Sequence, residues 1–212
     1  MVSLKEADAM ICGLNRSYAV TLESVEYVLD PIPNKRVLGL TVMICNGRTI
    51  FVADTNVHDM PNGSELADIT EQSAQVVREI FDIEPKAALL SYSNFGKPFT
   101  ERSAYIRDAL KILDKRNVDF EYDGEMAANV ALNENLLSLY PFCKLSGPAN
   151  LLIMPAIHSA SISTKLLQEL GGSNLVGPML VGLSKPIQII PTGSRVSEII
   201  NLAAIAACDL GR

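Results

Sequence analysis

The stretch of sequence that decides the fold is Lys86-Ala87-Ala88-Leu89-Leu90-Ser91-Tyr92-Ser93-Asn94-Phe95-Gly96-Lys97-Pro98. Its apolar first half predicts a strand over 86–92 that is buried on both faces, as is typical of parallel sheets. A polar loop with a glycine follows, and Thr100 is expected to cap a helix over about 101–116. Proteins of the α/β class bind anions at such loops, because backbone N–H groups and the helix dipole point at the ligand.

The loop offers a small set of candidate ligand-binding groups, namely Ser91, Ser93, Asn94 and backbone amides such as that of Gly96. Judged on composition alone, an ordinary strand-to-helix turn is the favoured interpretation.

Composition excludes several classes of protein. The 212 residues carry a net charge of −6, which argues against a broad electrostatic footprint for nucleic acid. No apolar run reaches transmembrane length, and the N-terminus lacks a signal-peptide core. The four cysteines lie far apart without a C-x-x-C pair, as in proteins of reducing compartments. We expect a soluble cytoplasmic protein without nucleic-acid or membrane partners.

Around the opening stretch, apolar periodicity predicts alternating strands and helices. Pro31-Ile32-Pro33-Asn34 breaks the chain and marks a candidate domain boundary, and Asn46-Gly47 suits the type I′ turn of a hairpin. Helix 159–170 is expected to turn Ile162, Leu166 and Leu170 inward. The predicted helices are 3–13, 17–29, 62–81, 101–116, 159–170 and 196–209, and the predicted strands are 37–45, 48–53, 86–92, 118–122, 150–154, 179–183 and 187–190. This order indicates a largely parallel sheet covered on both faces, with one antiparallel hairpin.

Ligands of such sheets bind outside the carboxyl ends of strands. The candidate segments are Ser91–Lys97, Tyr122–Glu125, Pro155–Ser159 and Pro191–Arg195. Asp123 is read as a helix cap, and no acid/base pair is inferred. Asp54, His58 and Asp59 are interpreted as a solvated loop, since nothing marks further metal ligands. Phosphate-loop, dinucleotide-binding and nucleophile-elbow motifs are absent from the sequence.

Several blocks in the right order resemble the phosphate acetyl/butyryl transferase family along nearly the full length. They are Ala7–Gly13, Phe51–Thr55, Ile83–Pro85, Leu90–Ser93, Tyr122–Met126, Gly147–Ile153 and Gly177–Pro186. The sequence resembles one branch of this family more closely, namely the C-terminal domain of the large multidomain NADP-dependent malic enzymes. The segments that carry this resemblance are Cys12–Tyr18, Ser93–Gly96, Phe120–Glu125 and Pro155–Ser163. The family's domain is longer at its N-terminus, so the resemblance implies a C-terminal fragment.

The resemblance implies a three-layer αβα, two-subdomain fold like that of phosphotransacetylases and of isocitrate and isopropylmalate dehydrogenases. Residues 1–34 and 187–212 would form a truncated, discontinuous first subdomain, and 35–186 a complete second one. It also implies an acetyl-CoA or anion cleft between them. The expected ligand-binding residues are Ser91, Ser93, Asn94, Gly96, Asn150, His158, Thr192, Gly193 and Ser194.

Departures from the family's pattern argue against transferase chemistry. The family's lysine in the loop is replaced by Phe95, and an arginine aligns with Glu23. Its Ser-Arg-Gly and a later aspartate are replaced by Pro191, Thr192, Gly193 and Glu198. Transfer of an acetyl group to phosphate needs positive charge to stabilise developing negative charge. We therefore predict no catalytic residue and no metal site in this chain.

Three functions remain open. The first is a regulatory domain of a malic enzyme, which binds acetyl-CoA as an allosteric inhibitor and mediates homo-oligomerisation, as a dimer or higher. The resemblance then implies upstream malic enzyme domains that use NADP and a divalent metal, Mg²⁺ or Mn²⁺, to convert malate to pyruvate. The second is an active phosphate acetyltransferase. The third is a structural dimerisation module with an empty cleft.

Overall fold

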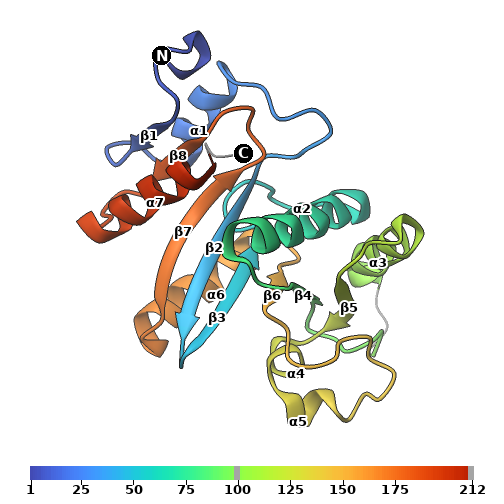
Figure 1. Cartoon of the computed structure of the whole chain (residues 1–212). Coiled ribbons are helices and arrows are strands. Elements are labelled where there is room, and N and C mark those ends of the chain that lie inside the picture. Colours follow the sequence, from blue (N-terminus) through green and yellow to red (C-terminus); the bar gives the residue numbers. More distant parts are fainter. Residues whose placement is uncertain (98–100, 210–212) are drawn as a thin grey trace.

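A six-stranded sheet forms the centre of the protein, whose computed structural model describes residues 1–97 and 101–209 (Figure 1). The strands lie in the order β5 (Glu121–Met126), β4 (Lys86–Leu90), β6 (Leu151–Ile153), β3 (Arg48–Ala53), β2 (Leu38–Cys45) and β7 (Asn174–Val181). The first four are mutually parallel, whereas β2 runs antiparallel to both β3 and β7. The predicted mostly parallel α/β sheet is thus confirmed.

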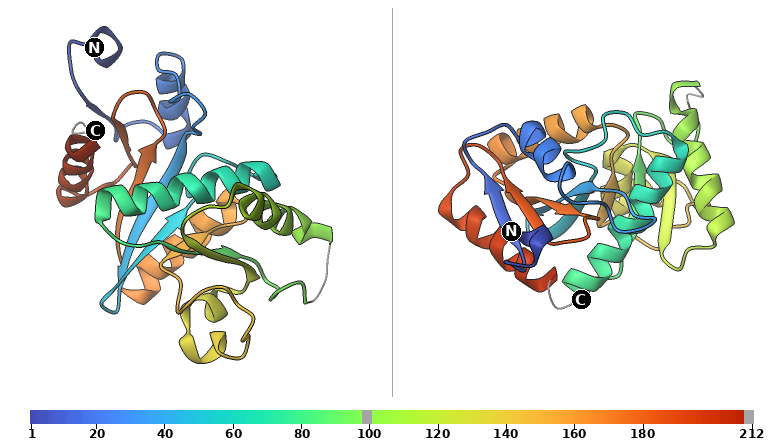
Figure 2. Two further views of the ribbon diagram at one scale, coloured as in Figure 1. Left: turned by 45° about the vertical axis from the view of Figure 1, so that its right-hand side comes forward. Right: turned by 90° about the horizontal axis from the view of Figure 1, so that it is seen from above.

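Helices cover both faces of this sheet (Figure 2). Ala87 and Leu89 of β4 pack in one cluster with α2 (Gly63–Phe81) and α3 (Ala104–Arg116). Ala88 and Leu90 point the other way. They pack with α4 (Ala128–Leu132), α5 (Glu134–Leu137) and Ala160 of α6 (Ile157–Gly171). Because side chains alternate along a strand, burial on both faces explains the uninterrupted apolar run in β4.

A second, two-stranded parallel sheet pairs β1 (Met10–Gly13) with β8 (Ile187–Ile190). It lies beside α1 (Tyr18–Glu26) and α7 (Val196–Asp209) (Figure 1). Buried residues of α1 and β8 share one apolar cluster with Leu180 of β7, so the core continues from the small sheet into the large one. The division into 1–34 with 187–212, and 35–186, stays a prediction.

Two chain segments are tied together where they pass between the sheets. The Ile32 amide donates to the Gly182 carbonyl at 2.8 Å, and the Ser184 amide donates to the Asp30 carbonyl at 3.0 Å. Gly182 has φ +93°, and a Cβ there would overlap the carbonyl oxygen of Arg36. Only glycine tolerates so close an approach of two backbones at this φ.

Several sequence-based predictions of local structure are confirmed. Asn46 and Gly47 both have positive φ, as the hairpin turn between β2 and β3 requires. Helix α2 begins after the N-cap Asn62, whose side chain accepts from the amides of Ser64 and Glu65. The predicted cap Thr100 and neighbouring Pro98 lie outside the described residues. Within the described part of the chain, no helix is both long and apolar enough to cross a membrane.

Three predictions of local structure are wrong. Residues 3–13 form a short 3-10 helix, η1 (Val2–Leu4), and strand β1 instead of one helix, because β1 pairs with a strand far away in the sequence. Strand β5 begins at Glu121 and continues to Met126, so Asp123 caps no helix. The side chains predicted to point inward from α6 are exposed, at 58% for Ile162, 52% for Leu166 and 83% for Leu170. Ala160 and Thr164 are buried in their place, on the face that packs against the sheet.

Candidate functional site

A cavity of about 390 Å³ opens at the carboxyl ends of β4 and β6. In parallel α/β sheets, ligand sites lie at this edge. Its walls come from the β4 and β6 connections, from the 3-10 turn η2 (Glu101–Ser103) with the start of α3, and from α4. The lining residues are Leu90, Ser91, Tyr92, Ser103, Tyr105, Ile106, Ala128, Met154, Pro155 and Ser159. Two of the four predicted strand-end segments, Ser91–Lys97 and Pro155–Ser159, thus contribute to one cavity.

A buried chain of hydrogen bonds runs beside this cavity. Ser91 Oγ lies 3.0 Å from Ser93 Oγ, which donates to Glu125 Oε1 at 2.8 Å. Arg107 Nη1 lies 3.2 and 3.3 Å from the two carboxylate oxygens of Glu125 and donates to Ser103 Oγ at 2.9 Å. Glu125 is 1% exposed. The chain therefore begins and ends at serines that line the cavity.

Tyr105 adds a phenol to the cavity wall. Its hydroxyl donates to the Pro155 carbonyl at 3.1 Å. Burial raises the pKa of Tyr105, and the nearby Glu125 charge raises it further. Tyr105 therefore stays a neutral hydrogen-bonding group at physiological pH.

Most backbone amides of the loop Ser91–Lys97 donate hydrogen bonds within the protein. Asn94 and Lys97 exchange two backbone hydrogen bonds, of 3.1 and 3.0 Å, around Phe95 and Gly96, which both have positive φ. The Phe95 amide donates to the Glu125 carbonyl at 2.6 Å, and the Ser91 amide to the Met126 carbonyl at 2.9 Å. The Asn94 side chain accepts from the Ala127 amide at 2.8 Å. The loop is thus a tight turn fastened to the end of β5.

Phe95, which is predicted to stand at the position of the family's lysine, packs into an aromatic cluster. Its ring centroid lies 5.0 Å from that of Tyr140 and 5.0 Å from that of Phe142. The turn therefore presents an apolar ring at this position.

The remaining predicted site residues do not gather at this cavity. Asn150 lies before β6, at the amino ends of the strands, where it accepts from the Lys86 amide at 2.7 Å and donates to the Glu84 carbonyl at 2.8 Å. His158 is exposed in the first turn of α6. Thr192, Gly193 and Ser194 follow β8 in the small sheet, where the Thr192 hydroxyl donates to the Arg16 carbonyl and the Ser194 hydroxyl to the Pro191 carbonyl. Among the described residues, no hydrogen bond joins Ser91 to Asn150 or to Thr192.

Sequence reasoning missed Glu125 and Arg107 as partners of the loop serines. The signal was the chain order: β5 is the strand that follows α3, and its register places Met126 beside Leu90. That register sets Glu125 beside the loop that begins at Ser91.

The loop after β3 also differs from its prediction as a solvated segment. Asp54 is 3% exposed, and its carboxylate accepts from the amides of Gly39, Asn56, Val57 and His58 at 2.7–3.3 Å. His58 Nδ1 lies 2.7 Å from Asp54 Oδ2. Among the described residues, no group of three His, Cys, Asp or Glu side chains is placed to hold a metal ion. Asp54 therefore organises this loop as a buried acceptor.

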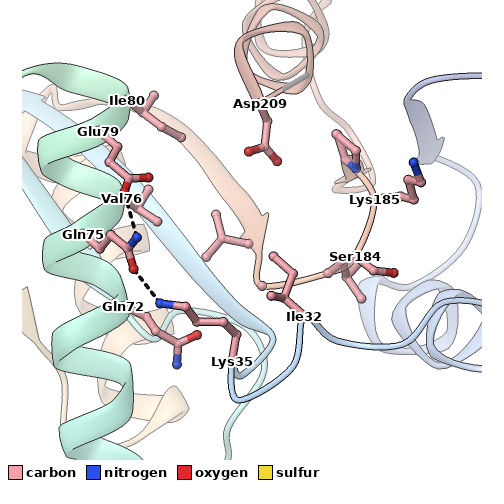
Figure 3. A pocket seen from close by; sticks show the side chains of 14 residues that line it. Ile32, Lys35, Gln72, Gln75, Val76, Glu79, Ile80, Ser184, Lys185 and Asp209 are labelled. Atoms are coloured by element: carbon pink, nitrogen blue, oxygen red, sulfur yellow. Dashed lines mark hydrogen bonds between the residues drawn. The ribbon is translucent and has the colours of Figure 1, made fainter. Parts of the chain in front are cut away.

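A second cavity, of about 360 Å³, lies between α2 and the two segments that pass between the sheets (Figure 3). Lys35 Nζ donates to Gln75 Oε1 at 2.5 Å, and Gln75 Nε2 donates to Glu79 Oε1 at 2.7 Å. Asp209 points toward it from the end of α7 (Figure 3), and Lys185 also contributes to its wall. Among the described lining residues, the positive charges of Lys35 and Lys185 are matched by the negative charges of Glu79 and Asp209, so this part of the lining has no excess positive charge for a phosphate. We place the candidate site at the strand ends instead.

Comparison with known proteins agrees with the fold and the motif order. The family model described as phosphate acetyl/butaryl transferase matches residues 1–207. The chain is 56% identical over 211 residues to an NADP-dependent malic enzyme of Rhizobium meliloti (strain 1021), covering 100% of this chain and 28% of that protein. It is 38% identical to an NADP-dependent malic enzyme of Escherichia coli (strain K12), covering 99% of this chain and 28% of that protein.

A crystal structure of a phosphotransacetylase from Streptococcus pyogenes superposes with a TM-score of 0.91 at 30% identity, covering 99% of this chain and 64% of that chain. The chain thus spans a little over a quarter of the length of the malic enzymes that it matches. Both resemblances predicted from the sequence are confirmed, and the chain belongs to the phosphate acetyl/butaryl transferase family.

Proposed function

We propose that this chain is the regulatory domain of an NADP-dependent malic enzyme, and that it binds acetyl-CoA without transferring its acetyl group. The observation that carries the proposal is the turn at Asn94–Lys97. Its Phe95 ring packs against Tyr140, and the amides of Asn94, Phe95 and Lys97 donate within the protein. We infer that an apolar ring at this point does not supply the positive charge that acetyl transfer to phosphate needs.

The cavity at the strand ends supports ligand binding. Its volume of about 390 Å³ falls in the range of small-molecule sites, and apolar and hydroxyl-bearing side chains line it. In the regulatory function, acetyl-CoA inhibits malate oxidation by binding one state of the oligomer more tightly than the other. NADP and the divalent metal, Mg²⁺ or Mn²⁺, bind to malic enzyme domains upstream of this chain, and the protein is cytoplasmic.

The exposed side of α6 supports homo-oligomerisation. Ile162, Leu166 and Leu170 lie one helical turn apart and are all more than half exposed. Ile44 of β2, 44% exposed, lies in the same groove as the C-terminal end of α6. Exposed apolar side chains that share one helix face are a feature of interfaces, and we propose that a second copy of the chain covers them.

Two parallel measurements test the proposal. Calorimetric titration of acetyl-CoA into the chain should show binding, while an assay for acetyl phosphate formation should stay at background. Turnover above background would overturn the regulatory function in favour of an active phosphate acetyltransferase. Absence of both signals would favour a structural dimerisation module. Titration of the longer malic enzyme, with malate oxidation as the readout, should show inhibition by acetyl-CoA.

A further inference from the structure

The hydrogen-bond chain beside the strand-end cavity fixes the direction of each hydroxyl. An ionised carboxylate only accepts hydrogen bonds, so Ser93 spends its single hydroxyl hydrogen on Glu125 Oε1 at 2.8 Å. Ser93 Oγ also lies 3.0 Å from Ser91 Oγ. Ser91 must therefore be the donor of that bond. Its own oxygen accepts from the Ser93 amide at 3.4 Å and keeps a second lone pair for another partner.

Arg107 holds Glu125 in the orientation that this relay needs. The guanidinium Nη1 reaches both carboxylate oxygens, at 3.2 and 3.3 Å, and balances a charge that water does not solvate. Charge-assisted hydrogen bonds of this type are stronger than neutral ones. The buried Glu125 carboxylate therefore accepts from both Arg107 and Ser93, and Ser93 in turn accepts from Ser91.

Among the described residues that line the cavity, all are apolar or carry hydroxyl groups, and none is a lysine or an arginine. The phosphates of a coenzyme A thioester therefore find no cation among these described side chains, whereas its pantetheine arm is uncharged and carries two secondary amides. A secondary amide N–H is a donor that matches an acceptor oxygen.

We propose that Glu125, acting through Ser93, makes Ser91 a hydrogen-bond acceptor in this cavity, and that Ser91 thereby recognises an amide N–H of the pantetheine arm of an acyl-CoA. This inference rests on the proposed function. Ser91 is the residue that contacts the ligand, and Glu125 is a positioning residue.

The test compares acetyl-CoA with an analogue in which an ester replaces the pantetheine amide nearest the thioester, so that only the N–H is lost. Calorimetry on the unmodified chain should give about tenfold weaker binding of the ester, as expected for one lost hydrogen bond and an unpaired acceptor. Ser91→Ala should bind both compounds with the same affinity. Ser138→Ala, which removes a serine hydroxyl that donates to the Asn135 carbonyl, should keep the tenfold preference.

Glu125→Gln tests the positioning role. Arg107 would hold the carboxamide oxygen, so the carboxamide N–H₂ would face Ser93 and reverse the direction of both serine hydroxyls. Ser91 would then donate into the cavity, and the preference for the amide should fall to about onefold or invert. If this variant does not fold, the Ser91→Ala comparison decides. Equal binding of amide and ester by the unmodified chain would overturn this inference and leave the proposed function standing. Failure of the folded chain to bind acetyl-CoA would overturn both.

Discussion

The ring of Phe95 packs against the ring of Tyr140, with centroids 5.0 Å apart and planes inclined by 43°. This contact fastens the turn Asn94–Lys97 over the end of the sheet, at the position that is predicted to align with the family's lysine. Phe95 is therefore a packing element of the turn.

A lysine at position 95 should destabilise the turn without producing transferase activity. Phe95→Lys removes the contacts with Tyr140 and Phe142, so we expect the free energy of unfolding to fall by about 1–2 kcal/mol in chemical denaturation. Lys97→Ala, in the same turn and exposed, should change it by less than about 0.5 kcal/mol. Acetyl phosphate formation by Phe95→Lys would contradict the prediction and would show that Phe95 prevents transferase activity.

Two glycines with positive φ should differ sharply in their tolerance of alanine. Gly47→Ala meets no atom within 4 Å, so only the backbone penalty of about 1 kcal/mol applies. Gly182→Ala drives a methyl group into the Arg36 carbonyl and should cost more than about 4 kcal/mol or prevent folding. Thermal unfolding of both variants measures the difference. Equal melting temperatures would show that the backbones at Arg36 and Gly182 can move apart without loss of stability.

The buried carboxylate of Asp54 should be among the costliest side chains to remove. Asp54→Ala leaves the amides of Gly39 and His58 without their acceptor, and we expect a loss of about 3 kcal/mol in urea unfolding. Asp59→Ala, in the same loop but exposed, is the matched control and should stay within about 0.5 kcal/mol. A small effect at Asp54 would mean that water replaces it as the acceptor.

A charge on the exposed side of α6 should dissociate the oligomer. Leu166→Lys places a cation in the proposed interface. Light scattering coupled to gel filtration should therefore show a monomer for this variant and a dimer or larger species for the unmodified chain. Leu139→Lys is the control, because Leu139 is 70% exposed and lies outside α6. An unchanged mass for Leu166→Lys would place the interface elsewhere.

Asp68 should stabilise the fold in a pH-dependent way. Burial alone would raise the pKa of Asp68, but hydrogen bonds from Arg36 and Arg116 outweigh it and hold the pKa below its ordinary value. A lowered pKa in the folded state adds stability above the unfolded pKa of about 3.9, and this is lost as the pH falls through the folded value. Asp68→Asn should therefore lower stability by about 1 kcal/mol at pH 7 and progressively less below about pH 4. High salt should shrink the difference at pH 7.

Local signals explain which elements could be predicted. The Asn46-Gly47 hairpin, the capped helix α2 and the apolar strand β4 each carry their pattern within one short window. Strand β1 carries no such pattern, because it is stabilised by pairing with β8, and Met10 lies opposite Ile187. The face of α6 was assigned wrongly for a related reason. Periodicity shows that Ile162, Leu166 and Leu170 share a face but does not say what covers it.

The sequence by itself determined the family, the order of the strands and helices after residue 17, and the position of the Ser91 loop at a strand end. These properties follow from local periodicity and from motif blocks that keep their order. Only the tertiary structure decided that Ser93 meets Glu125, 32 residues away, and that the loop amides are used within the protein. The physical reason is that the register of β4 against β5 sets which side chains meet, and a register between distant segments is not written in either segment alone.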